Sequence, residues 1–209
     1  MLSSRGPIRW RNSVFDWPWK PNILLCWRTQ NLKKLHRLYQ ESGIRVTDIY
    51  DGPGPTRYFD FWATCEGIRI TAQEDKRVQE EGFFPSWNRL GVSDLTHSVN
   101  WYQQYMGMEI EHDLRETGFV IMSLALSHQP EQKSLWVPKQ AANDAYIGKV
   151  DGPVRPYCRV AEREEFFRYH TFLSDSGIEV SDIGGFLTRG LACFHFYDPD
   201  GNRLNISTL

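Results

Sequence analysis

The sequence predicts an α+β fold made of repeated β-α-β-β-β units. Strand-like and helix-like stretches alternate along most of its 209 residues. Residues 41–49 (ESGIRVTDI) and 175–183 (DSGIEVSDI) agree closely, and the segments on both sides of them correspond as well. Ordered agreement over about fifty residues points to a duplicated supersecondary unit, which is sought before any short motif.

The chain closes with a stretch typical of a β-hairpin. Phe194 and Phe196 alternate with His195, which is the period of a strand with one buried face. Residues 198–201 (DPDG) supply turn chemistry, because proline presets φ and glycine accepts a positive φ. Apolar and polar residues alternate again after the turn, so we expect one face of the hairpin on helices and the other on a cavity.

The first unit is expected within residues 22–75. Leu32, Leu35 and Leu38 recur at helical spacing, and Gly43 follows as a common residue just beyond a helix C-terminus. The predicted elements are a strand over 23–27, a helix over 30–42, a strand over 44–49, and a hairpin over 58–62 and 68–71.

Two further units follow a charged linker over 76–86, and residues 1–21 form a tryptophan-containing N-terminal extension. The second unit has a helix that Asp94 caps and that runs to about Met106. Its predicted strands cover 87–92, 108–110, 119–126 and 134–137. After a loop over 138–154, the third unit has a strand over 157–160, a helix over 162–175, a strand over 178–183 and the closing hairpin.

Composition excludes several classes of protein. The 24 basic and 26 acidic side chains leave no positive excess for nucleic acid. No apolar run approaches the roughly 20 residues of a membrane span, and the first residues lack the apolar core of a signal peptide. The 4 cysteines are far apart and form no CxxC pair, which favours reduced thiols and a cytoplasmic location.

Three stretches carry a resemblance to a known family: 92–95 (VSDL), 100–102 (NWY) with Gly107, and 198–202 (DPDGN). In these three stretches the chain resembles the vicinal oxygen chelate superfamily, which includes glyoxalase I, extradiol dioxygenases and bleomycin-resistance proteins. The resemblance implies paired modules whose mixed sheets join edge to edge into cupped, open barrels with helices outside. It covers 87–209 as one two-module domain and 22–75 as a lone module.

Three modules is an odd number for this family. A lone 22–75 module would expose a sheet edge and an apolar cup, which proteins normally cover. Either the N-terminal extension or a second copy of the chain can complete it, and we favour a homodimer.

The resemblance also predicts that the family's metal site is missing. Metal-dependent members carry His or Glu ligands in the first strand of each module and in the last strand of a domain. Trp87 and Arg155 stand at the first-strand places, and Thr71 and Asn205 at the last-strand places. None is a good ligand for a divalent cation, so we expect neither a metal nor another cofactor.

The expected partner is a small molecule held in the cup of the 87–209 domain. The predicted ligand-binding residues share a place on the cup side of their strands: Trp87, Arg89, Arg155, His195, Arg203 and Asn205. Aromatic stacking and an arginine fork suit an anionic or aromatic ligand. The alternative is that Trp87 fills the cup and leaves no pocket.

Three functions stay open at this point. The first is a metal-free, glyoxalase- or bleomycin-resistance-like protein that binds a small molecule. The second is a metal-dependent lyase or dioxygenase with unusual ligands such as His195, His112 or Glu111. The third is an interaction or structural module with filled cavities. Whether the chain is an enzyme does not follow from the sequence, because fold alone does not determine function.

Overall fold

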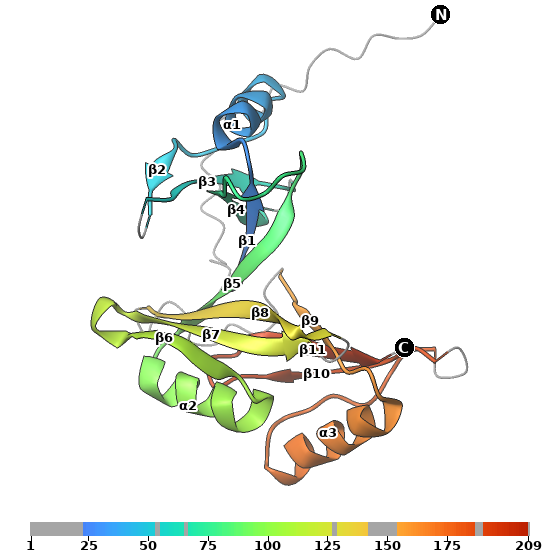
Figure 1. Ribbon diagram of the computed structural model, residues 1–209. Helices are drawn as coiled ribbons and strands as arrows, with labels where there is room; N and C mark the ends of the chain where they lie inside the picture. The colour runs from blue at the N-terminus through green and yellow to red at the C-terminus, as the bar shows by residue number, and fades with distance from the viewer. Residues whose placement is uncertain are drawn as a thin grey trace, which may run out of the picture.

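The computed structural model contains three modules and describes residues 23–52, 55–64, 67–126, 129–141, 154–186 and 190–208 (Figure 1). The first module comprises β1 (Ile23–Thr29), α1 (Leu32–Glu41), β2 (Tyr50–Asp51), β3 (Arg57–Trp62) and β4 (Arg69–Glu74). The second comprises β5 (Phe84–Val92), α2 (Leu95–Met106), β6 (Glu109–Leu114), the 3₁₀ helix η1 (Arg115–Thr117), β7 (Phe119–Leu126) and β8 (Gln129–Gln140). The third comprises β9 (Tyr157–Arg159), α3 (Arg163–Asp175), β10 (Ala192–Tyr197) and β11 (Arg203–Thr208).

The expected α+β class with repeated modules is confirmed. The prediction for residues 1–21 and most of the predicted loop over 138–154 lie outside the described residues. The linker over 76–86 is shorter than predicted, because β5 already begins at Phe84. In the described part of the chain, no helix is long and apolar enough to cross a membrane.

The first and second modules share one open, eight-stranded sheet in the order β2-β3-β4-β1-β5-β8-β7-β6. Its centre is the antiparallel pair β1–β5, in which Leu24 lies opposite Arg89 and Cys26 opposite Trp87. The third module has a separate three-stranded sheet, in the order β10-β11-β9. Figure 1 shows α1 beyond one end of this assembly and α2 and α3 beyond the other.

The expected pairing of modules is therefore wrong. We expected residues 87–209 to join their sheets edge to edge and the 22–75 module to be completed by the N-terminal extension or a second copy, whereas β1 of the first module joins β5 of the second. A short connection after β4 brings these two strands together, in keeping with the tendency of consecutive elements to lie side by side. The second and third modules share a core instead of a sheet.

Two hydrophobic cores hold the modules together. The smaller core lies between α1 and the first-module strands and contains Leu32, Phe59, Phe61, Ile70 and Ala72. The larger core joins the helix-covered faces of the second and third modules. Its members come from α2, α3 and strands of both sheets, and include Leu90, Tyr102, Met122, Trp136, Phe166, Phe194, Phe196 and Leu204. Residues 87–209 thus pack as a unit although their strands do not form one sheet.

The internal repeat extends to individual hydrogen bonds. His36 Nε2 donates to the Thr47 carbonyl (2.8 Å), and His170 Nε2 donates to the Ser181 carbonyl (3.0 Å). The ring of His36 also meets Phe59 edge-on at 4.9 Å, and His170 meets Phe194 in the same way at the same distance. Two of the six histidines are therefore accounted for as structural links between a helix and the segment beneath it.

The same repeat explains why the predicted strands over 44–49 and 178–183 are not regular strands. Each makes only isolated bridges, Val46 to Phe61 and Val180 to Phe196. The Thr47 hydroxyl accepts the backbone N–H of Asp60 (2.9 Å), and the Ser181 hydroxyl accepts that of His195 (3.0 Å). A side-chain oxygen thus replaces a carbonyl of the ladder, which is the competition expected of Ser and Thr.

The closing DPDG turn connects the third module to the second. Asp198 is buried, and its carboxylate accepts from the hydroxyl of Tyr102 on α2 and from the backbone and side-chain N–H groups of Asn202. Asp200 accepts from the backbone N–H of Ser93 (2.8 Å), and its other oxygen from the Ser98 hydroxyl (3.2 Å). The residues that signal the turn in the sequence therefore also fasten two modules.

Candidate functional site

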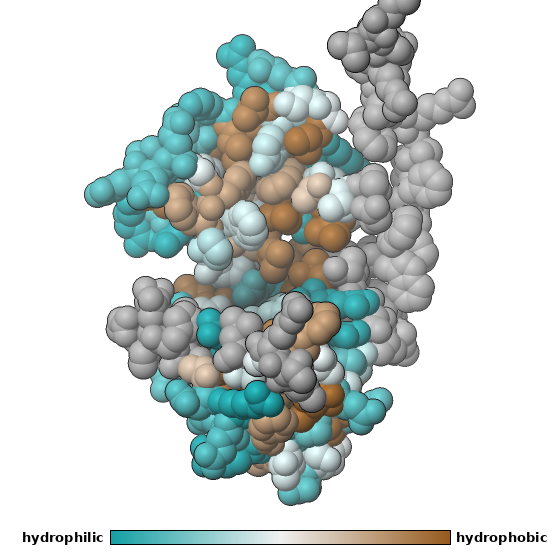
Figure 2. All heavy atoms as spheres, turned by 90° about the vertical axis from the view of Figure 1, so that its right-hand side faces the viewer, coloured by the Kyte–Doolittle hydropathy of each residue, from teal (hydrophilic) through white to brown (hydrophobic). Residues whose placement is uncertain are grey.

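The candidate site lies on the face of the eight-stranded sheet that points away from the helices. Phe59, Phe61, Ile70 and Ala72 pack against α1, so the residues that alternate with them face the opposite side. We call the surface formed by Cys26, Asp60, Thr71, Trp87 and Arg89 the cup. Figure 2 shows the molecule hollowed between the part that carries α1 and the part that carries α2 and α3.

Strand register places four residues in a row across the centre of the cup. Cys26 lies beside Thr71 in the β1–β4 pair and beside Trp87 in the β1–β5 pair. Trp87 in turn lies beside Leu135 in the β5–β8 pair. The row is therefore Thr71, Cys26, Trp87 and Leu135, and it crosses both modules where their first and last strands meet.

This row does not fit a divalent metal. It offers a hydroxyl, a thiol, an indole and an aliphatic side chain, whereas such cations bind imidazole, carboxylate or thiolate. Burial, and after it the negative charge of Asp60, raises the pKa of the Cys26 thiol far above its ordinary value, so the sulfur keeps its proton. Within the described ranges, no group of three or more His, Cys, Asp and Glu side chains could hold an ion.

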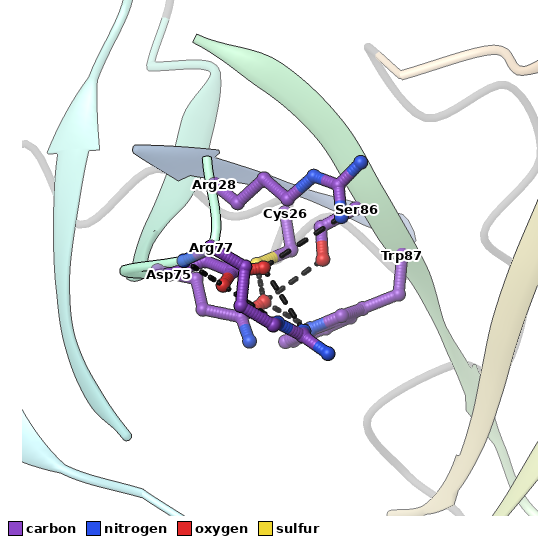
Figure 3. A network of polar contacts seen from close by, with 7 residues as sticks. Cys26, Arg28, Asp75, Arg77, Ser86 and Trp87 are labelled. Carbon is purple, nitrogen blue, oxygen red and sulfur yellow. Dashed lines mark hydrogen bonds and ion pairs between the residues drawn. The ribbon is translucent and has the colours of Figure 1, made fainter. Parts of the chain in front are cut away.

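A hydrogen-bond network centred on Gln73 orders the end of the cup nearest the loop before β5 (Figure 3). Its side-chain oxygen accepts from Ser86 Oγ (2.9 Å) and Trp87 Nε1 (3.1 Å), and Cys26 Sγ lies 3.7 Å away. The indole of Trp87 is thus fixed by its N–H, which leaves the ring in a defined position on the wall of the cup. A hollow of about 500 Å³ at this end is lined by Pro55, Thr56, Arg57, Gln73, Glu74, Asp75, Lys76 and Arg77.

A second polar cluster surrounds Asp60. Its carboxylate accepts from Thr71 Oγ1 (2.7 Å) and from the Tyr50 hydroxyl (3.2 Å), and Arg69 lies 3.8 Å from its second oxygen. Burial and the negative charge of Asp60 raise the pKa of Tyr50 to about 12, while the positive charges of Arg69 and Arg89 act in the opposite direction. Asp60 therefore has two hydroxyl donors and a nearby positive charge.

One hydrogen-bond donor of this cluster, on Arg69, has no acceptor among the described residues. Arg69 Nε is buried and has no hydrogen-bond partner in the described part of the chain. A buried unpaired donor costs free energy, which an acceptor brought by a ligand would recover. The geometry therefore marks the neighbourhood of Asp60 and Arg69 as a place that suits an oxygen-bearing ligand.

The six predicted site residues fall on two separate faces. Trp87 and Arg89 belong to the cup, where the β1–β5 register places them opposite Cys26 and Leu24. His195, Arg203 and Asn205 lie on the three-stranded sheet and alternate with Phe194, Phe196 and Leu204, which point into the shared core. Leu90 points into the same core from the other side, so the two groups of predicted residues face away from each other.

The structure does bring the third-module residues together. Arg203 reaches His195 Nδ1 (3.1 Å) and Asn205 Oδ1 (3.3 Å). Because a guanidinium only donates, His195 Nδ1 must accept, and its ring proton lies on Nε2. Arg155 is exposed just before β9.

Sequence reasoning missed Asp60, Thr71 and Gln73 as site residues. The signal that could have found them is the repeat itself. Asp60 pairs with Thr71 in the first module as His195 pairs with Asn205 in the third. Arg69 approaches Asp60 as Arg203 approaches His195. Extending the third-module prediction to its first-module counterparts therefore identifies Asp60 and Thr71, whereas Gln73 has no predicted counterpart.

The fold is built from β-α-β-β-β modules, two of which join their sheets around the cup. The family model of the Glyoxalase/Bleomycin resistance protein/Dioxygenase superfamily matches residues 86–206, which is more than half of the chain, and the chain belongs to this superfamily. No curated protein matches the chain significantly.

Solved structures share the fold at low sequence identity. A putative dioxygenase from Bacillus subtilis superposes with a TM-score of 0.66 at 12% identity, over 90% of this chain and 62% of that one. Glyoxalase I from Zea mays superposes with a TM-score of 0.64 at 13% identity, over 88% of this chain and 66% of that one. The chain therefore spans less than two thirds of the length of these structures, and the likeness establishes the fold alone.

Proposed function

We propose that the chain binds a small anionic or aromatic molecule in the cup of the eight-stranded sheet, without a catalytic metal. The observation that carries the proposal is the central row of Thr71, Cys26, Trp87 and Leu135, which holds no ligand set for a divalent cation. The cup differs from the one expected for residues 87–209, because its second half comes from the first module.

The chemistry of the walls supports this ligand class. Trp87 offers a fixed aromatic face beside the row, and an aromatic ring stacks on such a face at little entropic cost. Arg69 offers a buried N–H without an acceptor, and an arginine fork suits a carboxylate or a similar oxyanion. Asp60 holds Arg69 in place from one side, so a ligand oxygen would complete the coordination of the guanidinium.

The test combines metal analysis with a ligand screen. Purified protein is analysed for bound divalent ions, and its melting temperature is measured with aromatic carboxylates and with neutral aromatics of matched size. A ligand that binds only the folded state at 100 times its Kd adds about 2.7 kcal/mol to stability. We expect the carboxylates to stabilise the protein more than their neutral counterparts.

Two matched variants locate the site. Arg69→Met should abolish the stabilisation by carboxylates, because it removes the donor in the cup. Arg203→Met changes the corresponding residue on the three-stranded sheet and should leave it intact. A stoichiometric divalent ion in the purified protein, or equal loss in both variants, would overturn the proposal.

A metal-dependent lyase or dioxygenase with unusual ligands is the competing function. Its candidate ligands lie apart, since His195 is on the three-stranded sheet while Glu111 and His112 are on β6. Glu111 is engaged by Lys133 Nζ (2.7 Å) and Ser123 Oγ (2.7 Å). The metal analysis above separates this function from the one proposed.

A further inference from the structure

β9 occupies in the third module the place that β1 occupies in the first. Thr71 of β4 pairs with Cys26 of β1, and Asn205 of β11, its counterpart in the repeat, pairs with Tyr157 of β9. The outer edge of β1 is covered by β5. Within the described ranges, by contrast, β9 ends the three-stranded sheet.

The backbone of this edge is arranged for further pairing. The Pro156 carbonyl accepts from Asn205 N (2.9 Å), and Val160 N donates to the Ser207 carbonyl (2.9 Å), so alternate residues of this segment face β11. Arg155 and Tyr157 therefore turn their backbone N–H and C=O groups outward. Pro156 directs its nitrogen inward, so its missing N–H does not weaken the outer edge.

Two side chains on this edge are also uncovered. Tyr157 is 67% exposed, as much as any other exposed large hydrophobic side chain of the described chain. Arg155 is exposed as well. Natural proteins seldom leave an edge strand with open backbone groups and an exposed aromatic side chain without a covering partner.

We propose that β9 pairs antiparallel with β9 of a second copy of this chain, about a two-fold axis at Pro156. The β1–β5 junction supplies the register. At its centre Leu25 lies opposite Asn88, and each stands six residues before the cap of the following helix, Asn31 or Asp94. The residue six before Glu162, which caps α3, is Pro156.

This register gives a self-complementary edge. Pro156 lies opposite its own copy at a position without ladder hydrogen bonds, where proline is tolerated. Tyr157 of each chain lies opposite Arg155 of the other, and the two pairs combine backbone hydrogen bonds with arginine–aromatic contact. The two three-stranded sheets become one sheet of six strands, and the face that carries His195 and Asn205 gains Arg155 of the partner as a new wall.

A second copy of the chain is favoured over an unrelated partner, because Tyr157 and Arg155 are each other's partners across the interface and both belong to the same chain. An interface of this kind is isologous, and two-fold dimers are the commonest soluble oligomers. The inference concerns the third module and does not depend on ligand binding in the cup.

The test measures mass and cross-linking of the whole chain. Sedimentation and light scattering at tens of micromolar protein should give twice the chain mass of 24.4 kDa. Tyr157→Pro removes an outward N–H and should weaken self-association by at least about tenfold. Its melting temperature under dilution should match that of diluted wild type, which shows that the fold is kept.

Pro156→Cys tests the register. Opposed residues at such a position have Cα atoms about 4.5 Å apart, which lies within the range of a disulfide. Under mild oxidation this variant should form a disulfide-linked dimer, whereas Asp113→Cys, on the exposed edge strand β6, should form little. A monomer at high concentration, an undiminished dimer in Tyr157→Pro, or equal cross-linking of the two cysteine variants would overturn the proposal.

Discussion

Replacing Tyr102 with phenylalanine is expected to weaken the junction between the second and third modules. Tyr102 is fully buried, and its hydroxyl donates to the buried carboxylate of Asp198 in the DPDG turn. The aromatic ring keeps its contacts with Trp101 in the variant, so the change is confined to one hydrogen bond. Asp198 is only 5% exposed, so we expect water to replace this donor poorly in the variant.

The stability that Tyr102→Phe loses depends on pH in a definite direction. Burial raises the pKa of Asp198 from 3.8 to about 6, while the hydrogen bonds from Tyr102 and Asn202 oppose the rise. Because the folded state favours the protonated form, this contribution to stability is fully present below pH 4 and is lost as pH rises through about 6. Keeping the Asp198 carboxylate ionised and buried at pH 8 therefore costs on the order of 3 kcal/mol of folding free energy. The hydrogen bond from Tyr102 keeps this cost from being larger.

Loss of a hydrogen bond to a charged group costs about 1.5–3 kcal/mol, and loss of a neutral one about 1 kcal/mol. Tyr102→Phe should therefore lower the free energy of unfolding by about 2–3 kcal/mol at pH 8 and by clearly less at pH 5. Urea unfolding at both pH values measures the difference. Ser98→Ala, which removes the longer contact to Asp200 from the same helix, serves as the control and should cost less at pH 8. Equal losses for Tyr102→Phe at the two pH values would refute the reasoning.

Two further predictions concern the first module. Phe59→Ala removes a fully buried ring between α1 and the sheet and should cost about 3–5 kcal/mol in urea unfolding. Phe186→Ala, at a 67% exposed position, should change stability by less than about 0.5 kcal/mol, and similar losses in both would contradict the assigned core. Asp60→Asn should lower the pKa of Tyr50 from about 12, although not to its ordinary value, because burial is the larger cause of the rise. Tyrosinate absorbance against pH measures this shift by comparison with Tyr50→Phe. Asp48→Asn is the control, and an unchanged Tyr50 titration in Asp60→Asn would show that Asp60 does not act on it.

Local patterns predicted most of the elements because they depend on neighbouring residues. Leu32 and Leu35 at helical spacing, Asp94 as a cap and Gly107 with φ of 65° as a terminator all have the roles that the sequence indicates. The strands predicted over 44–49 and 178–183 failed because Thr47 and Ser181 use side-chain hydroxyls in place of the ladder. That substitution involves partners in a distant hairpin, so alternation within the segment does not reveal it.

Module pairing could not be predicted because it depends on which faces and edges meet. The closing motif identified the third module, and the repeat identified the first, but neither says that β1 pairs with β5. The same limit applies to the site. His195, Arg203 and Asn205 do gather as predicted, yet Trp87 and Arg89 lie on another face because the second module directs its helix side toward the third.

The repeat separates the structural residues of a module from those that vary on its concave face. Both copies keep the helix histidine that donates to the segment beneath the helix, and the hydroxyl that replaces a ladder carbonyl. On the opposite face, Asp60 is replaced by His195, Thr71 by Asn205 and Cys26 by Tyr157, while an arginine stays at Arg69 and Arg203. Because the scaffold is held by one set of residues, the other set is free to change with the ligand. Among the described residues, neither version of this face gathers three or more His, Cys, Asp or Glu side chains that could hold a metal ion, and both versions retain an arginine. The feature common to both faces is therefore the arginine, whose guanidinium suits an anionic group.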